Sequence, residues 1–286
     1  MFFTLESFDI IKPCTLLEPF IKYYWILDYE NNLVEPIRVI PYGCVQFTLY
    51  LGGKINSLGS NNDSSYKDQA VVTGQISSYF DVVPQGKIRL ITIVFKPFGA
   101  KPFFDFPISE IKNNIIPIKD INNSDWLDLE KRLSDCKDNK SIIACLEENL
   151  LVKLKKNNLF NSYFNINYDR VLSAIGRIES SKGCVNIKEL SSLVCLSDKQ
   201  FNRIFADYVG INPKHFLRIV RYQSVLLKLQ NSNLSDYKDI DLHDLVYDFG
   251  YYDQSHLINN FKEFTGYTPR EYISLFSPCS EYFSNL

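Results

Sequence analysis

Two stretches of the C-terminal region carry polar and basic side chains whose types suit contacts with the edges of DNA bases. In residues 196–216 these side chains are Lys199, Gln200, Asn202 and Arg203. In residues 252–272 they are Gln254, Ser255, His256 and Asn259. Arginine can donate two hydrogen bonds to guanine, and asparagine or glutamine can pair in the same way with adenine. We therefore predict that these residues read bases in the major groove of double-stranded DNA.

The elements that would present these side chains are two amphipathic helices with the same pattern. Leu257, Phe261 and Phe264 fall at i, i+4 and i+7, which places them on one buried face of a helix. The opposite face is polar, and Asn260 is expected on it with the residues named above. The apolar residues at the matching positions of the first stretch, each 56 residues earlier, are Phe201, Phe205 and Tyr208.

The constant shift indicates a duplicated unit of two short helices joined by a tight turn, which is a helix-turn-helix. Ser197 is expected to cap the second helix of the first unit in a capping box with Gln200, and Gly210 to end it in the left-handed conformation. Asp253 and Gly266 have these two roles in the second unit. The caps expected for the first helix of each unit are Asn186, in a box with Glu189, and Asp241. A purely structural helical bundle would explain the caps and apolar faces, but it explains the polar faces less well.

Local charge distinguishes the two units, although the chain of 286 residues has a formal net charge of only −2. Residues 199–228 hold six basic residues and one acidic residue, a net +5, whereas residues 236–253 hold one basic and six acidic residues, a net −5. The first unit is therefore expected to supply more of the affinity for phosphate. The acidic stretch should face away from the duplex, or face another protein such as RNA polymerase. The residues expected to contact phosphate are Lys214, Arg218 and Arg221.

A rigid helix from about Pro213 to Leu229 is expected to connect the two units. At about 1.5 Å per residue, this helix would be roughly 25 Å long. A connector of this length can hold two reading helices about one turn of DNA apart, which is roughly 34 Å.

Residues 1–118 have the pattern of a β-rich domain, a barrel or a sandwich. Short segments rich in aromatic and β-branched residues are bounded by Gly, Pro and Asn, which predicts strands at 20–27, 36–41, 44–51, 69–76 and 87–95. Cys44 is expected to pack inside one of these strands. Residues 51–68 are polar and rich in turn-forming residues, and we expect a loop there.

Residues 119–160 are predicted to form a helical extension, and residues 161–286 an all-α DNA-binding domain, so the predicted fold class is α+β. The segment 157–167 breaks the helical pattern and is expected to be a linker. An apolar stripe in the extension either forms the seam of a homodimer or packs on the chain's own barrel. The stripe consists of Ile142, Cys145, Leu146 and Leu150.

Composition argues against several classes of protein. The seven cysteines show neither a C-x-x-C pair nor the Cys/His spacing of a zinc site, so we expect a reducing compartment and no metal. The N-terminus lacks the pattern of a signal peptide, and no apolar run approaches the roughly 20 residues of a membrane span. We therefore expect a cytoplasmic protein that has no cofactor and no membrane partner.

The duplicated unit resembles the AraC/XylS family of bacterial transcription regulators. The resemblance covers about residues 168–275 and is most specific in GYYDQSHLINNFKEFTGYTPREY, residues 250–272. It implies that positions 199, 202 and 203 face bases in the first unit, and positions 254, 255, 256 and 259 in the second. The family often has Arg where this chain has Asn259 and Phe where it has Leu257, and Asn260 replaces an apolar residue seen at the matching Ile204 of the first unit. These departures imply that the second unit binds more weakly or reads a different base.

The N-terminal region resembles a domain that precedes this DNA-binding unit in one branch of the family. The similar stretches are RVIPYGCVQFTLYLGG, VTGQISSYF and IVFKPFGAKPFFDFPISEIKNNIIPIKDI. The related domain commonly has Asp where this chain has Tyr42. The resemblance implies a domain that senses an unknown small-molecule effector or a partner, or that dimerises. The cupin-like sugar-binding barrel of the better-known family members serves only as an analogy.

Two other functions fit parts of the sequence. Some DNA-repair alkyltransferases carry an AraC-like helix pair beside a zinc-bound reactive cysteine, but Cys14 and Cys44 lack the clustered spacing of such a site. A helical protein-interaction scaffold would use the apolar stripe for partners and would not bind DNA. We therefore expect a transcription regulator that binds promoter DNA, and no enzymatic activity.

Overall fold

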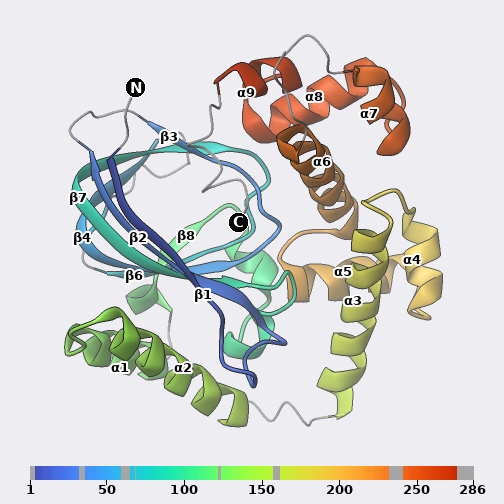
Figure 1. The fold of residues 1–286 in the computed structure, drawn as a ribbon. Helices are drawn as coiled ribbons and strands as arrows, with labels where there is room; N and C mark the ends of the chain where they lie inside the picture. The colour runs from blue at the N-terminus through green and yellow to red at the C-terminus, as the bar shows by residue number, and fades with distance from the viewer. Residues whose placement is uncertain are drawn as a thin grey trace.

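The computed structural model describes residues 4–31, 36–58, 65–67, 69–121, 124–156, 162–231 and 241–275. Figure 1 shows a curved sheet with two helices beneath it in the N-terminal part, and a group of helices in the C-terminal part, so the fold class is α+β. Within the described ranges, none of the helices is long and apolar enough to cross a membrane.

The N-terminal part is built on one antiparallel sheet, in which the described residues form eight strands. The main path through the sheet is β1-β2-β7-β4-β6-β8, and β3 and β5 add to β7 and β4. The register of β4 against β7 shifts on both sides of Gly52, and such bulges increase the twist and bend of a sheet. The strands are β1 (Thr4–Ile11), β2 (Ile21–Asn31), β3 (Ile37–Val39), β4 (Gln46–Leu58), β5 (Ser65–Tyr66), β6 (Ala70–Thr73), β7 (Phe80–Phe95) and β8 (Ile115–Pro117).

The sheet differs from the sequence prediction in several places. β4 continues to Leu58 and β5 consists of Ser65 and Tyr66, so the loop prediction is wrong for residues 51–58 and 65–66, while residues 59–64 and 68 of that loop lie outside the described residues. Ile55 of this segment packs with Ile88 and Leu90, and this apolar contact compensates for two glycines of low strand propensity. Cys44 lies in a bend before β4, and its thiol donates to the Tyr42 carbonyl. The sequence pattern also does not predict β1 or β8.

Two helices, α1 (Ser124–Ser134) and α2 (Asn139–Lys156), close one side of the curved sheet. The Trp126 ring stacks between Phe47 of β4 and Phe104, with ring centroids 5.3 and 5.2 Å apart. The apolar stripe of α2 lies in the same core. Its side chains, 0 to 8% exposed, are those of Ile142, Cys145, Leu146 and Leu150. The stripe therefore packs on the chain's own sheet and is not available as the seam of a dimer.

The C-terminal part contains the helices that follow the extension, and their buried faces form a second core. They are α3 (Ser162–Ser180), α4 (Ile187–Leu193), α5 (Asp198–Val209), α6 (Pro213–Asn231), α7 (Leu242–Asp248), α8 (Gln254–Thr265) and α9 (Pro269–Leu275). Helix α3 already begins at Ser162, so the predicted linker is wrong for residues 162–167, and residues 157–161 lie outside the described part.

The N-terminal and C-terminal parts share a packed interface. Ile40 and Phe98 of the N-terminal part belong to the core formed by the C-terminal helices. The Phe98 ring meets the Tyr168 ring of α3 edge-on, with centroids 5.3 Å apart. Three 3-10 helices follow β7 along the chain: η1 (Lys101–Phe103), η2 (Ile108–Ile111) and η3 (Ile118–Asp120). Of these, η1 and η2 contact α5 of the C-terminal part.

Candidate nucleic-acid interface

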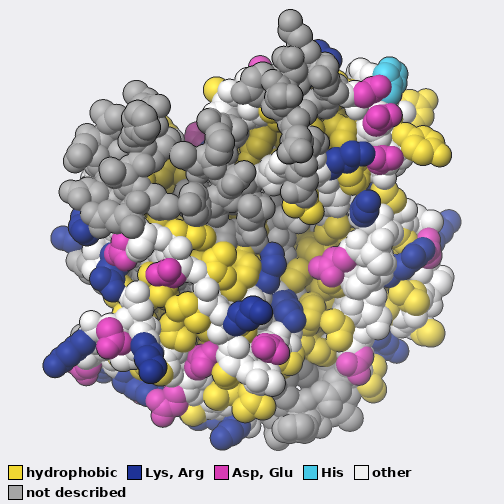
Figure 2. All heavy atoms as spheres, in the orientation of Figure 1, with side chains coloured by type: hydrophobic (Ala, Val, Ile, Leu, Met, Phe, Trp, Pro, Cys, Tyr) yellow, Lys and Arg dark blue, Asp and Glu magenta, His cyan; other side chains and the backbone are white. Residues whose placement is uncertain are grey.

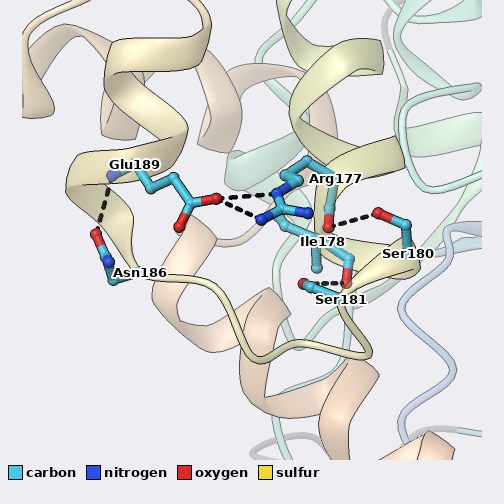
Figure 3. A network of polar contacts seen from close by, with 6 residues as sticks. All are labelled: Arg177, Ile178, Ser180, Ser181, Asn186 and Glu189. Atoms are coloured by element: carbon cyan, nitrogen blue, oxygen red, sulfur yellow. Dashed lines mark hydrogen bonds and ion pairs between the residues drawn. The ribbon is translucent and has the colours of Figure 1, made fainter.

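The first helix-turn-helix unit consists of α4, a tight turn and α5. Asn186 caps α4, because its side chain accepts a hydrogen bond from the Glu189 amide at 2.9 Å. The Glu189 carboxylate does not complete the predicted capping box; it accepts two hydrogen bonds from Arg177 of α3 at 2.9 and 2.6 Å (Figure 3). This ion pair ties the unit to the helix that precedes it.

The turn and both ends of α5 follow the sequence prediction. Cys195 has a φ of 53°, which allows the chain to reverse between α4 and α5. Ser197 and Gln200 form a capping box at the start of α5, and Gly210, with a φ of 94°, ends the helix in the left-handed conformation. The apolar face of α5, including Phe201 and Phe205, is fully buried.

The residues of α5 that are predicted to read bases differ in their exposure and in their hydrogen bonds within the protein. Lys199 and Arg203 are exposed and lie one helical turn apart. Asn202 is half-buried and donates to the Asp198 carbonyl at 2.8 Å. The Gln200 side-chain oxygen accepts from the Ser197 hydroxyl at 3.0 Å within the capping box. Lys199 and Arg203 are therefore the side chains of this set that are best placed to reach a base.

The second unit repeats this geometry with α7 and α8. Asp241 caps α7, Gly250 turns the chain with a φ of 60°, and Asp253 caps α8 by accepting from the His256 amide at 2.7 Å. Gly266 ends α8 with a φ of 79°. The sequence therefore predicts the caps and turns of both units, because each depends on residues within one or two turns of the chain.

The exposed face of α8 presents Ser255, His256 and Asn259, whereas Gln254 is half-buried. The Nδ1 atom of His256 accepts from the Tyr252 amide at 3.3 Å, so this ring is partly held by the turn. Lys262 is exposed one turn beyond Asn259, on the same face, and the sequence analysis does not single it out. The sequence signal that could have indicated Lys262 is its position three residues after Asn259, which places both on one face of the helix.

Asn260 is buried, so the prediction that it lies on the exposed face is wrong. Its side chain is 3% exposed, because position 260 matches Ile204 on the side of the helix that packs inward. With the amide oxygen toward Arg218, Asn260 accepts from that guanidinium at 2.8 and 3.2 Å and donates to the Tyr251 hydroxyl at 2.9 Å. Pairing on both sides offsets the cost of burying a polar amide.

The three residues predicted to contact phosphate have different surroundings. Lys214 is exposed. Arg218 is half-buried, pairs with the Glu263 carboxylate and lies over the Phe264 ring, 5.3 Å from its centroid. Arg221 is also half-buried and donates to the Gly183 carbonyl at 2.7 Å. The two arginines therefore hold α6 to neighbouring elements, and Lys214 is the most accessible of the three.

Helix α6 joins the two units. Its 19 residues correspond to about 28 Å. Phe216 near its start packs against Phe205 of α5, and Tyr222 packs against Phe261 and Phe264 of α8. Helices α5 and α8, the two predicted reading helices, thus both pack against α6. Figure 2 shows carboxylates beside a histidine at the end of the molecule where α7 lies, in agreement with the acidic character of that stretch.

His215 of α6 lies at the interface with the N-terminal part. Its side chain hydrogen bonds with the Ser77 backbone, and its Nε2 atom is buried with no partner among the described residues. Burial lowers the pKa of His215 from its ordinary value of 6.5, and the positive charges of Arg218 and Lys112 lower it further, against an opposing effect of Glu263.

We expect His215 to make the protein less stable in mild acid. The folded-state pKa of His215 lies below the unfolded value of 6.5, so the unfolded chain takes up the proton first as the pH falls. Protonation of the unfolded chain therefore lowers the free energy of unfolding below pH 6.5. Urea unfolding at pH 7.5 and pH 5.5 should show a smaller loss for His215→Gln than for the wild type, with the exposed His243→Gln as control. An unchanged pH dependence in His215→Gln would assign the effect to other groups.

Cys44 lacks the character of a reactive cysteine. Burial raises the pKa of the Cys44 thiol to about 11, so the nucleophilic thiolate is scarce near neutral pH. Within the described residues, no group of three or more His, Cys, Asp or Glu side chains is arranged to hold a metal ion.

Comparisons with known proteins match both parts of the chain. Residues 190–274 match the family described as "Helix-turn-helix domain", and residues 9–117 match the family described as "Domain of unknown function (DUF6597)". An uncharacterized HTH-type transcriptional regulator of Haemophilus influenzae is 26% identical over 140 residues. That match spans 46% of this chain and 45% of the relative, which is less than half of its length.

Solved structures of ToxT from Vibrio cholerae are similar at low sequence identity. One is 9% identical, covers 89% of this chain and 99% of its own, and gives a TM-score of 0.48. A structure of ToxT bound to an unsaturated fatty acid is 10% identical, covers 89% of this chain and 96% of its own, and gives a TM-score of 0.45.

The two family matches coincide with the two parts of the fold. The helix-turn-helix match covers α5 to α8, which include the two helices predicted to read bases, and the N-terminal match covers most of the curved sheet. The duplicated unit, with caps and left-handed glycines 56 residues apart, has the organisation expected from the sequence. The chain therefore has a region similar to the DUF6597 family, followed by a region similar to the helix-turn-helix domain family, which is the order that the sequence resemblance predicts.

Proposed function

We propose that this protein is a transcription regulator whose two helix-turn-helix units read adjacent major-groove segments of a promoter. The observation that carries the proposal is the repetition of exposed polar side chains at matching positions. Lys199 matches Ser255 and Arg203 matches Asn259, and all four are exposed on capped helices that rest on α6. A purely structural bundle has no need of this repetition on its solvent face.

The base contacts divide between the two units in this proposal. Arg203 has the chemistry to pair with guanine, and Asn259 to pair with adenine. Lys214 and Lys262, both exposed, supply contacts to phosphate, which position the protein but carry no sequence information. Arg218 and Arg221 contribute mainly by holding the helices, because their guanidinium groups already have partners inside the domain.

The remaining parts of the chain complete the proposal. Residues 1–118 act as a sensor of an unknown effector or partner, residues 119–160 as a helical extension of that sensor, and residues 161–286 as the DNA-binding domain. The protein acts in the cytoplasm and has no catalytic role. The acidic surface of α7, with Asp241, Asp244 and Asp248 exposed, faces away from DNA and is available to RNA polymerase. A homodimer would have to use a surface other than the buried stripe of α2.

Selection of bound fragments from a random DNA pool tests the proposal. We expect the selected fragments to share two short conserved segments about one helical turn apart, roughly 10 base pairs. A gel-shift titration should then show at least about 1,000-fold tighter binding to the selected site than to a scrambled duplex, the lower end of the range for specific regulators. Fragments without any common sequence would contradict the proposal.

A further inference from the structure

Both reading helices end against the N-terminal domain, at matching positions. A Cβ atom added to Gly210 would lie 3.0 Å from Cγ of Gln75 and 2.9 Å from Cγ2 of Ile108. A Cβ atom added to Gly266, which is 56 residues later, would lie 2.9 Å from the Tyr79 ring. The left-handed glycines that terminate α5 and α8 therefore also permit close approach of the sheet domain.

The contact at α8 is made by Arg38 of β3. Its guanidinium donates to the two carboxylate oxygens of Asp81 at 2.8 and 3.0 Å, and to the carbonyl of Thr265 at 3.2 Å. The same group lies between the rings of Tyr79 and Tyr267, at 4.2 and 4.6 Å from their centroids. Thr265 is the last residue of α8, and a cation there bonds a carbonyl that has no partner within the helix.

The residues that follow Arg38 contact the connector α6. Ile40 is buried in the core of the helical part. The Pro41 carbonyl accepts a hydrogen bond from Gln223 at 3.2 Å. Gly43 has a φ of 68°, and a Cβ atom at this position would lie 3.2 Å from the Phe216 ring. We call residues 38–43 the docking segment, because they bind both α6 and the end of α8.

A separate part of the N-terminal domain holds the first reading helix. The Lys101 ammonium of η1 donates to the Asp207 carboxylate at 3.0 Å and to the Phe106 carbonyl at 3.1 Å. Helix η2 packs against α5, and Ile108 of η2 lies beside Gly210. Each reading helix therefore has its own contact on one shared domain.

We propose that the docking segment positions the second reading helix relative to the first, so that the N-terminal domain sets the spacing between DNA half-sites that the protein accepts. The inference rests on the proposed DNA-reading function. Helix α6 packs against Phe261 and Phe264 of α8, and the docking segment adds a contact from the N-terminal domain at the last residue of the same helix. Release of Arg38 leaves α8 with its contacts to α6, α7 and α9 but without this hold on the N-terminal domain, which lets the helix tilt.

Hydrogen exchange of the full-length protein tests the positioning step without DNA. In Arg38→Ala, amides of residues 262–273 should exchange about tenfold faster than in the wild type, which corresponds to about 1.4 kcal/mol. The matched control is Arg89→Ala, which removes an arginine that pairs with Asn139 inside the N-terminal domain. Lys101→Ala should accelerate exchange near the end of α5 and leave α8 unchanged. Equal exchange at residues 262–273 in Arg38→Ala and wild type would overturn the proposal.

Binding to spaced half-sites tests the consequence. Inserting one base pair between the two selected segments rotates them by roughly 34° and should weaken wild-type binding at least about tenfold. The same insertion should weaken DNA binding by Arg38→Ala less than about threefold. Arg38→Lys, which keeps the charge but not the two-pronged pairing, should fall between them. Equal sensitivity to the insertion in all three proteins would overturn the proposal. If the wild-type protein showed no sequence preference, the proposed DNA-reading function would be wrong. The hydrogen-exchange result would still test whether Arg38 positions α8.

Discussion

Replacing Arg203 with alanine should cost about 1–3 kcal/mol of discrimination between the selected site and a site altered at one guanine, or about 5- to 150-fold. Arg203 is exposed on α5, one turn beyond Lys199 and above a buried aromatic face that fixes the helix. A guanidinium in this position can donate two hydrogen bonds to guanine and lose both when the base is changed. Gel-shift titration with both duplexes measures the effect.

Arg270→Ala is the matched control for Arg203. Arg270 is an exposed arginine of the same domain, on α9 and outside the reading helices. Its loss should leave the ratio of specific to altered-site affinity unchanged. If Arg203→Ala weakens binding to both duplexes equally, Arg203 contacts phosphate and the base-reading role is wrong.

Trp126→Ala should lower the free energy of unfolding of the N-terminal domain by about 3–5 kcal/mol. The ring is 1% exposed, stacks on Phe47 and Phe104, and lies under the ammonium of Lys153, 4.4 Å from the ring centroid. Its removal leaves a cavity between the sheet and the helices that close it. Urea unfolding followed by circular dichroism measures the loss.

Val152→Ala provides the comparison for Trp126. Val152 lies on α2 as well but is 42% exposed, so its truncation should change the unfolding free energy by less than about 0.5 kcal/mol. Similar destabilisation by the two substitutions would show that the stacked tryptophan is not a main support of this core.

The helix-turn-helix units can be predicted from the sequence because their determinants are local. Ser197, Gly210, Asp253 and Gly266 each act within a few residues of themselves, and the 56-residue shift supplies the same information twice. The apolar spacing then fixes which face of each helix is buried. The strands follow in the same way where β-branched and aromatic residues alternate with polar ones.

The features that the sequence does not reveal depend on partners far away in the chain. Asn260 has the chemistry of a base-reading residue, and its contact with Arg218 of another helix makes it part of a buried bridge. The second half of β4 contains two glycines, and its pairing with β7 outweighs their weak propensity. Arg38 and Thr265 are 227 residues apart, and no local rule joins them.

The contacts of Arg38 with α8 also limit how freely the two halves of this protein can be recombined. A chimera that places a foreign sensor in front of residues 162–275 would separate Tyr267 and Gly266 from the groups they pack against. Such a hybrid would need the strand that carries Arg38, together with Tyr79 and Asp81, to be transplanted with the helices. The two halves are separate stretches of the sequence, but the residues on both sides of their interface must be kept together.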